Sequence, residues 1–247
     1  MSLITKLVFI TLVLASLGLS NKASDIRVIN GQPVPPGKFN EIVFLHMADH
    51  KCTATIVGPR TLLTAAHCID VAPDTWFEFK GQKYTAFFYQ SPLYISSMDD
   101  DMAIGFTEKD MVGANPATVG HAIREKANVR FFGYGCDSIA GTGIGVLRFG
   151  DSIIQVIGSD VNGYNFTTHE NGESGAMICN GDSGGPNFLV ENGQLFLVGI
   201  NRSTDFAGES DFTNLTHPAS REFIEKTIEE HGAKVCGINQ KCTPWPM

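Results

Sequence analysis

The sequence predicts an all-β protein that ends in a single α-helix, and three observations lead to this prediction. Short runs of β-branched and aromatic residues lie close together, separated by Gly, Pro, Asn and Asp, which is typical of a β-sandwich or a β-barrel. The 247 residues include 26 glycines, which tight turns between neighbouring strands require. One segment near the end, residues 220–232, has apolar side chains at helical spacing.

The first residues resemble an export signal. Lys6 precedes an apolar run over residues 7–15, and small residues follow as far as Ser20. This order is that of a secretory signal peptide. We expect cleavage after Ser20, a secreted (extracellular or periplasmic) protein, and a short propeptide over residues 21–27. An uncleaved membrane anchor is the alternative, although the run is short for a membrane-spanning helix.

Composition narrows the class of protein. Hydrophobic residues make up 43% and charged residues 18% of the chain, as in globular proteins. The net charge of −8 argues against nucleic acid and against an anionic membrane as partners. Six cysteines in an exported chain suggest three disulfides.

The predicted strands lie between residues 41 and 200. They cover residues 41–46, 53–57, 77–79, 83–89, 129–132, 144–149 and 195–200. A weakly patterned stretch, residues 109–128, is expected to link two halves of the chain. The terminal helix should begin near Pro218 and end at Gly232. Its apolar face consists of Phe223, Ile224, Thr227 and Ile228.

Ser183 is the candidate nucleophile. It lies in a glycine-rich segment, residues 181–186, where the backbone can turn sharply. Such a turn allows the N–H groups of Gly181 and Ser183 to point at one place, where they would stabilise the oxyanion of an acyl-transfer intermediate. A glycine-rich turn with a solvated serine is the alternative interpretation.

A serine hydroxyl needs a base, and His67 is the candidate. Small residues precede it, and a disulfide from the adjacent Cys68 to Cys52 would fix its loop. A structural or metal-binding histidine is the alternative. His46 and His50 near Cys52 resemble part of a metal site, but we expect no metal and no cofactor, because Cys52 is required for the disulfide.

The base in turn needs a carboxylate to orient it. Asp101 stands directly before an apolar strand, so it is the candidate for the buried carboxylate. Asp99 and Asp100 precede it, and we expect both to lie in a solvated acidic turn.

Together these segments resemble the signatures of the trypsin and chymotrypsin family of serine peptidases. The matching stretches are TAAHC (64–68), DMAI (101–104) and GDSGGP (181–186), in the order His, Asp, Ser. Residues 27–31, RVING, resemble the activation site of that family. The resemblance extends from residue 28 to about residue 231.

The resemblance implies a fold and an activity. The fold would be two antiparallel six-stranded β-barrels, about 28–118 and 119–216, followed by a helix and a disulfide tail over 217–247. The activity would be that of a monomeric serine endopeptidase whose triad is His67, Asp101 and Ser183, acting on protein or peptide substrates.

The resemblance also implies a zymogen. An activating protease would cut after Arg27, and the freed ammonium of Val28 would turn inward to pair with Asp182. That ion pair would shape the turn of Gly181 and Ser183. The residue chemistry agrees with this, because a buried aspartate beside the nucleophile needs a cationic partner.

The chain also departs from the family pattern. Cys179 lacks its usual later partner, so Cys136 is the expected replacement, which leaves Cys236 with Cys242. Met177 takes the place of the pocket floor, with Thr204 and Ser210 as walls. An unpaired cation is costly in such a pocket, so we expect cleavage after apolar or small residues rather than after Lys or Arg. Arg202 also leaves room for a preference for acidic residues.

Other functions fit parts of the sequence. Gly181 to Gly185 also satisfies the G-x-S-x-G pattern of lipases and esterases, but that fold alternates strands with helices, and none is visible before residue 217. A non-catalytic binding protein on a protease fold is the second alternative. Three N-glycosylation patterns begin at Asn165, Asn201 and Asn214, and we interpret them as chance matches unless the source is eukaryotic.

Overall fold

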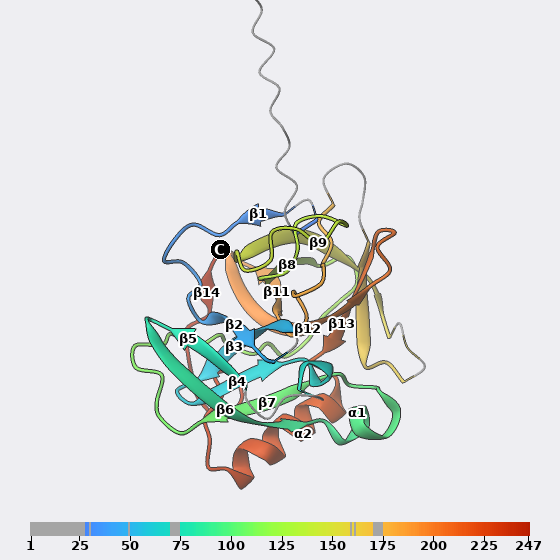
Figure 1. Ribbon diagram of the computed structural model, residues 1–247. Helices are drawn as coiled ribbons and strands as arrows, with labels where there is room; N and C mark the ends of the chain where they lie inside the picture. Colours follow the sequence, from blue (N-terminus) through green and yellow to red (C-terminus); the bar gives the residue numbers. More distant parts are fainter. Residues whose placement is uncertain are drawn as a thin grey trace, which may run out of the picture.

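The computed structural model describes residues 28–29, 31–48, 50–69, 75–158, 160, 162–169 and 175–247. The predicted signal peptide and residues 21–27 lie outside these ranges. The described chain forms two antiparallel β-barrels, which Figure 1 shows one above the other, with the C-terminal helix beside the first. In the described ranges, no helix is long and apolar enough to span a membrane.

The first barrel consists of six strands closed in the order β2-β3-β4-β7-β6-β5. Their bounds are β2 Ile42–His46, β3 Lys51–Gly58, β4 Thr61–Thr64, β5 Trp76–Phe79, β6 Gln82–Gln90 and β7 Ala103–Thr107. Strand β5 shows why the sequence forms a barrel wall. Phe77 and Phe79 are buried and Glu78 between them is exposed, as the two-residue period of a strand dictates.

The second barrel closes through pairing of β8 with β9. Its strands are β8 Asn128–Gly133, β9 Arg148–Ile157, β10 Asn165–His169, β11 Pro186–Glu191, β12 Gln194–Thr204 and β13 Glu209–Asn214. Phe131, Phe166 and Phe212 fill its core, the last two stacked with ring centroids 5.2 Å apart.

Both ends of the described chain join the second barrel. Strand β1 (Gln32–Pro33) pairs with β9, and strand β14 (Trp245–Pro246) pairs with β12. The resemblance implied a first barrel over about residues 28–118, and β1, which lies within that range, pairs with β9 of the second barrel. Residues 108–127, between β7 and β8, contain no strand; the sequence placed the link between the two halves at residues 109–128.

The predicted helix is present as α2, Pro218–Glu230. His217 caps it, because its side chain accepts a hydrogen bond from the N–H of Ala219. Ile224 and Ile228 are fully buried in the same core as Ile56 of the first barrel, although α2 follows the second barrel in the chain. Burial of this apolar face fixes the helix against the molecule.

Two local predictions were wrong. The strand expected at residues 144–149 begins only at Arg148, because Gly143 and Gly145 adopt positive φ and Ile144 and Val146 are exposed. A short helix, α1 (Pro92–Ser97), precedes residue 217 although no helix was expected there. Ser91 caps α1, with its hydroxyl accepting from the N–H of Leu93, and Pro92 starts it.

The six cysteines form the three expected disulfides, Cys52–Cys68, Cys136–Cys179 and Cys236–Cys242. The first two flank the segments that carry His67 and Ser183. The third closes a short loop after α2.

Candidate active site

His67 is held on a short 3-10 helix, Ala66–Cys68, which follows β4. Ala65 and Ala66 before it are fully buried, so the backbone packs tightly against the barrel. The disulfide from Cys68 to Cys52 ties this turn to β3. The imidazole itself is about one-third exposed, with its side chain 35% accessible to solvent. A buried backbone with a partly exposed ring suits a base that must reach a substrate.

Asp101 orients that ring. Its Oδ2 lies 2.6 Å from His67 Nδ1, and its Oδ1 accepts a hydrogen bond of 2.9 Å from the backbone N–H of His67. Asp101 is buried, and the hydroxyl of Thr213 donates to its carbonyl oxygen at 3.0 Å. Because Nδ1 is engaged by the carboxylate, Nε2 is the nitrogen that faces away from Asp101 and is available to a hydroxyl.

Ser183 lies beside the wall that carries His67. The backbone N–H of Thr53 donates to the Ser183 carbonyl at 2.8 Å, and the Thr53 hydroxyl donates to the Gly181 carbonyl at 2.9 Å. Gly184 has a φ of +80°, and a Cβ there would lie 2.1 Å from Thr64 Oγ1, so only glycine fits. Thr53 is next to Cys52, so the serine turn and the histidine turn are fixed to the same strand.

The structure therefore brings His67 and Asp101 into contact, and it holds the Ser183 turn on Thr53, the residue after Cys52. Within the described ranges no hydrogen bond joins the Ser183 hydroxyl to His67. Such bonds are often long before substrate binds.

The two predicted oxyanion donors are the N–H groups of Gly181 and Ser183. In the segment 181–185, the N–H groups of Asp182, Gly184 and Gly185 donate to backbone carbonyls at 2.9 Å. The N–H groups of Gly181 and Ser183 have no hydrogen-bond acceptor among the described residues. Two free donors on either side of Asp182, in a turn with Gly181 at φ +95°, are available to a ligand oxygen.

Asp182 is fully buried beneath this turn. Its Oδ1 accepts from the Gly135 N–H at 2.7 Å and its Oδ2 from the Cys179 N–H at 2.8 Å. Burial raises the pKa of Asp182 to about 7, despite these two hydrogen bonds and the nearby charge of Arg148. Asp182 makes no ion pair in the part of the chain that the structure describes.

Val28, the residue that would follow the predicted cleavage site, is buried in the structure. Its side chain is fully buried with Val129 and Ile178, and the carbonyl of Ile29 accepts from the Met177 N–H at 2.9 Å. The predicted activation residue Arg27 lies outside the described residues. The segment that would supply the new ammonium thus packs against the same stretch of chain that leads to Asp182.

The three residues predicted to form the specificity pocket come from neighbouring segments. Met177 is buried in a small cluster with Ile29, Cys136 and Cys179. Ser210 is buried and its hydroxyl accepts from the N–H of Ile178, the residue next to Met177. Thr204 pairs with Ser210 across β12 and β13, and its hydroxyl donates to the Glu209 carbonyl. Met177 and Ser210 are therefore close, and both are uncharged.

Arg202 is not free to attract an acidic substrate. Its guanidinium forms an ion pair with Asp211 at 2.5 Å, on a bulge where the register of β12 shifts against β13. The positive charge of Arg202, which the sequence offered as a possible selector of acidic substrate residues, is therefore balanced by Asp211.

His46 and the Cys52 sulfur, which resembled part of a metal site in the sequence, are both engaged within the protein, and the asparagines of the three glycosylation patterns are buried. His46 stacks on Trp76 with centroids 3.9 Å apart, and the Cys52 sulfur is bonded to Cys68, so neither sulfur is a thiolate ligand. Asn165, Asn201 and Asn214 are 3%, 0% and 4% exposed. A glycan on any of these asparagines is incompatible with the folded strands.

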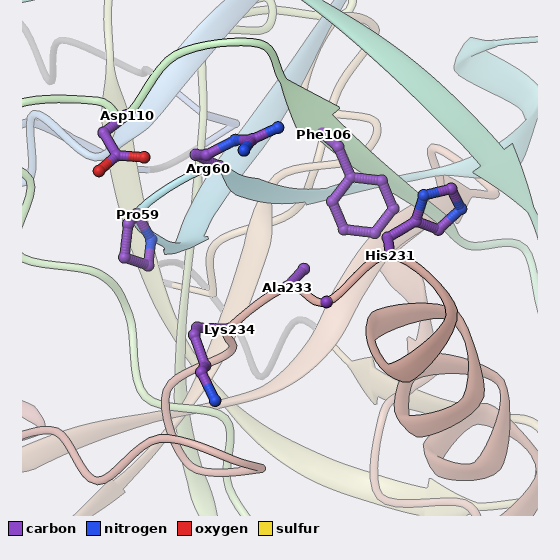
Figure 2. Close-up of a pocket in the computed structure, with 8 residues that line it drawn as sticks. Pro59, Arg60, Phe106, Asp110, His231, Ala233 and Lys234 are labelled. Atoms are coloured by element: carbon purple, nitrogen blue, oxygen red, sulfur yellow. The ribbon is translucent and has the colours of Figure 1, made fainter.

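A separate pocket of about 300 Å³ lies at the end of α2. Figure 2 shows His231 beside Phe106 at its edge, with Arg60 and Lys234 on other sides. His67, Asp101 and Ser183 do not line it, so this hollow is distinct from the candidate active site.

Sequence reasoning missed three supporting residues. The Thr53 hydroxyl donates to the Gly181 carbonyl, and the Thr213 hydroxyl donates to the Asp101 carbonyl. The Asn201 side chain donates to the carbonyls of Phe132 and Asp182. All three act on backbone atoms distant in sequence, so no local pattern marks them. Asp100 was also misjudged: it is fully buried rather than solvated.

Comparison with known proteins gives a consistent result. The trypsin family profile matches residues 28–214. The chain is 30% identical over 106 residues to transmembrane protease serine 9 of Rattus norvegicus, covering 37% of this chain and 10% of that protein. It is 36% identical over 66 residues to serine protease 28 of Mus musculus, covering 24% of each chain. The chain thus spans a quarter or less of these relatives.

A solved structure shares the fold. The VesB protease of Vibrio cholerae superimposes with a TM-score of 0.64 at 21% sequence identity, covering 81% of this chain and 68% of the other. At that identity the likeness bears on the architecture of the two barrels.

Proposed function

Because the chain belongs to the trypsin family, as the match over residues 28–214 shows, we propose that it is a secreted serine endopeptidase made as a zymogen. His67, Asp101 and Ser183 form its catalytic triad. The observation that carries the proposal is the 2.6 Å contact of His67 Nδ1 with Asp101 Oδ2, on a turn fixed beside Ser183.

The chemistry follows from these positions. The Ser183 hydroxyl oxygen bonds to the carbonyl carbon of the scissile peptide while His67 Nε2 accepts its proton. The carbonyl oxygen becomes an oxyanion and accepts from the N–H groups of Gly181 and Ser183. The C–N bond then breaks, the imidazolium returns the proton to the leaving amine, and an acyl-enzyme ester remains. Water hydrolyses that ester by the same proton transfers in reverse order.

Asp101 acts through His67. Its carboxylate holds the ring so that Nε2 faces the serine, and it stabilises the imidazolium while the proton resides there. The backbone N–H of His67 donates to the same carboxylate, which fixes both partners in one arrangement.

We further propose that the residue before the cut is apolar or small. The uncharged floor at Met177 and the buried hydroxyl of Ser210 support this, since they offer no counter-charge for Lys or Arg. Profiling a peptide library with the cleaved enzyme measures this preference directly. A dominant preference for Lys or Arg would reject the assignment.

The proposed activity is tested by comparing the cleaved wild-type chain with Ser183→Ala and His67→Ala on an unfolded protein substrate. We expect each variant to lose kcat by about a million-fold while near-UV circular dichroism shows an unchanged fold. A cleaved, folded wild type that hydrolyses nothing would favour a non-catalytic binding protein instead.

A further inference from the structure

We propose that Asp100 is a positioning residue: its buried carboxylate, held by Ser91 and Ser220, fixes the turn that presents Asp101 to His67. This inference rests on the proposed function and adds a residue that acts on the triad through Asp101. Asp100 itself contacts neither His67 nor Ser183 in the described hydrogen bonds.

The side chain of Asp100 joins three segments that are far apart in the chain. Its Oδ2 accepts from the Ser91 hydroxyl at 2.6 Å, and its Oδ1 accepts from the Ser220 hydroxyl at 2.5 Å. Ser91 caps α1, and Ser220 lies in the first turn of α2. Asp100 and Ser220 are both 0% exposed, so water does not compete for these bonds.

The backbone at Asp100 is in an uncommon conformation. Its φ is +49°, in the left-handed region that Asp tolerates better than most residues but that still disfavours any side chain. The chain then turns tightly, with Met102 N–H donating to the Asp100 carbonyl at 2.6 Å and Ser91 N–H donating to the Met102 carbonyl at 2.9 Å. A left-handed residue directly before Asp101 sets the direction of the next side chain.

Two independent anchors therefore flank Asp101. The Asp100 carboxylate fixes the residue before it, and the Thr213 hydroxyl fixes its own carbonyl. A displacement of about 1 Å at a catalytic group can lower a rate by about 100-fold, so loss of the first anchor should be measurable in catalysis.

The charges around Asp100 fit an anchoring role. Burial raises the pKa of its carboxyl group, the hydroxyl donors Ser220 and Ser91 lower it, and His217 and Asp101 are the charged or titratable groups that act on it. Two serine hydroxyls give each oxygen of this buried carboxylate one hydrogen-bond donor.

The test uses variants that separate the effect of the backbone conformation at Asp100 from the effect of its carboxylate. Asp100→Gly keeps the positive φ, which glycine adopts freely, but removes both hydrogen bonds. Ser220→Ala removes one of these bonds and leaves Asp100 in place. Ser91→Ala removes the other bond and also the cap of α1. Asp99→Asn is the matched control, because Asp99 is the neighbouring acid and its contacts, with Ser97 and Asn162, are exposed.

We expect kcat to fall by about 100-fold in Asp100→Gly, by less in each serine variant, and within two-fold in Asp99→Asn. KM should stay nearly constant, because the substrate pocket is untouched. The far-downfield proton resonance of the His67 Nδ1–Asp101 hydrogen bond should shift or broaden in the same order. All rates are compared per folded molecule, with the folded fraction taken from near-UV circular dichroism.

Wild-type kcat in a folded Asp100→Gly variant, with the proton resonance unchanged, would overturn the proposal. So would a fall in kcat that only follows the folded fraction. If Asp100→Gly fails to fold, the two serine variants decide by the same measurements. If the wild type proves inactive on peptides, the proposed function fails, yet the proton resonance still tests whether Asp100 positions Asp101.

Discussion

Burial of Asp182 disfavours the charged form of its carboxyl group. The carboxyl group is fully enclosed, and Gly135 approaches so closely that a Cβ at that glycine would lie 2.6 Å from the Asp182 nitrogen. Two backbone N–H donors satisfy the oxygens but supply no full positive charge. The cation proposed to enter on activation is the ammonium of Val28, whose segment already packs beside residue 177.

The raised pKa of Asp182, about 7 against an ordinary value of 3.8, makes a prediction for the uncut chain. Between these pH values the folded protein holds a proton that the unfolded protein releases, so rising pH should lower the free energy of unfolding. The loss reaches up to about 4 kcal/mol above pH 7. Urea unfolding at pH 5 and pH 8 measures the part of this loss that falls between those two pH values, about 2–3 kcal/mol, with Asp182→Asn as the reference that lacks this titration. Parallel stability curves for the two proteins would contradict the account of Asp182.

Individual site residues differed in how far the sequence could predict them. Short motifs in the sequence marked His67, Asp101 and Ser183 as candidates. The structure joins the first two by a hydrogen bond. Asp100 was misjudged because three consecutive acids look solvated, whereas α2 and α1 supply hydroxyls from far along the chain. A residue whose partners come from distant elements has no local pattern.

Among the elements, α2 and the segment after it connect the two barrels. The helix follows the second barrel but buries Ile224 and Ile228 in the core of the first. The chain then returns, and Cys236 N–H donates to the Val57 carbonyl while Val119 N–H donates to the Cys236 carbonyl. Strand β14 ends this path on β12 of the second barrel.

Trp245 tests the contribution of this segment. It is buried, packs against Phe39 and Phe188, and donates from its indole nitrogen to the Asn115 carbonyl at 2.8 Å. We expect Trp245→Ala to lower the free energy of unfolding by about 3–5 kcal/mol. Met247→Ala is the control, since Met247 is exposed and should change stability little. Equal urea midpoints for the two variants would show that the segment does not support the fold.

The sequence predicted helices and strands correctly where apolar residues repeat at a regular spacing. The runs at β5 and α2 were predicted closely because their buried faces repeat at two and at about 3.6 residues. Helix α1 was missed because six residues show too little periodicity, and Ser91 with Pro92 was its only local sign. The false strand at residues 144–147 has an apolar pattern, but it is exposed beside glycines with positive φ.

At the scale of the whole molecule, the fold was predictable through motif resemblance rather than through strand patterns. Alternating apolar runs indicated only a sandwich or barrel, whereas two closed six-stranded barrels are what the structure contains. The pairing of β1 with β9 was not predicted, because a strand of two residues, Gln32 and Pro33, is too short to show the two-residue period of a strand.

The proposed activation belongs to the scale of the whole chain, because it would couple the N-terminal segment to the serine turn. We expect Arg27→Gln to leave a folded precursor without activity, since an intact peptide bond at Val28 supplies no ammonium to Asp182. Peptide hydrolysis before and after treatment with an Arg-specific protease measures this, and Arg60→Gln, at an exposed turn of the first barrel, is the control. Full activity of the Arg27→Gln chain would rule out the zymogen.

The central claim is that His67 activates Ser183 in the cleaved protein. Its most direct test is reaction with a phosphonylating probe, followed by mass spectrometry of the labelled peptide. The account predicts rapid single labelling at Ser183 after cleavage at Arg27, and loss of that labelling in His67→Ala. A folded, cleaved protein that takes up no label, or that is labelled equally fast without His67, would contradict it.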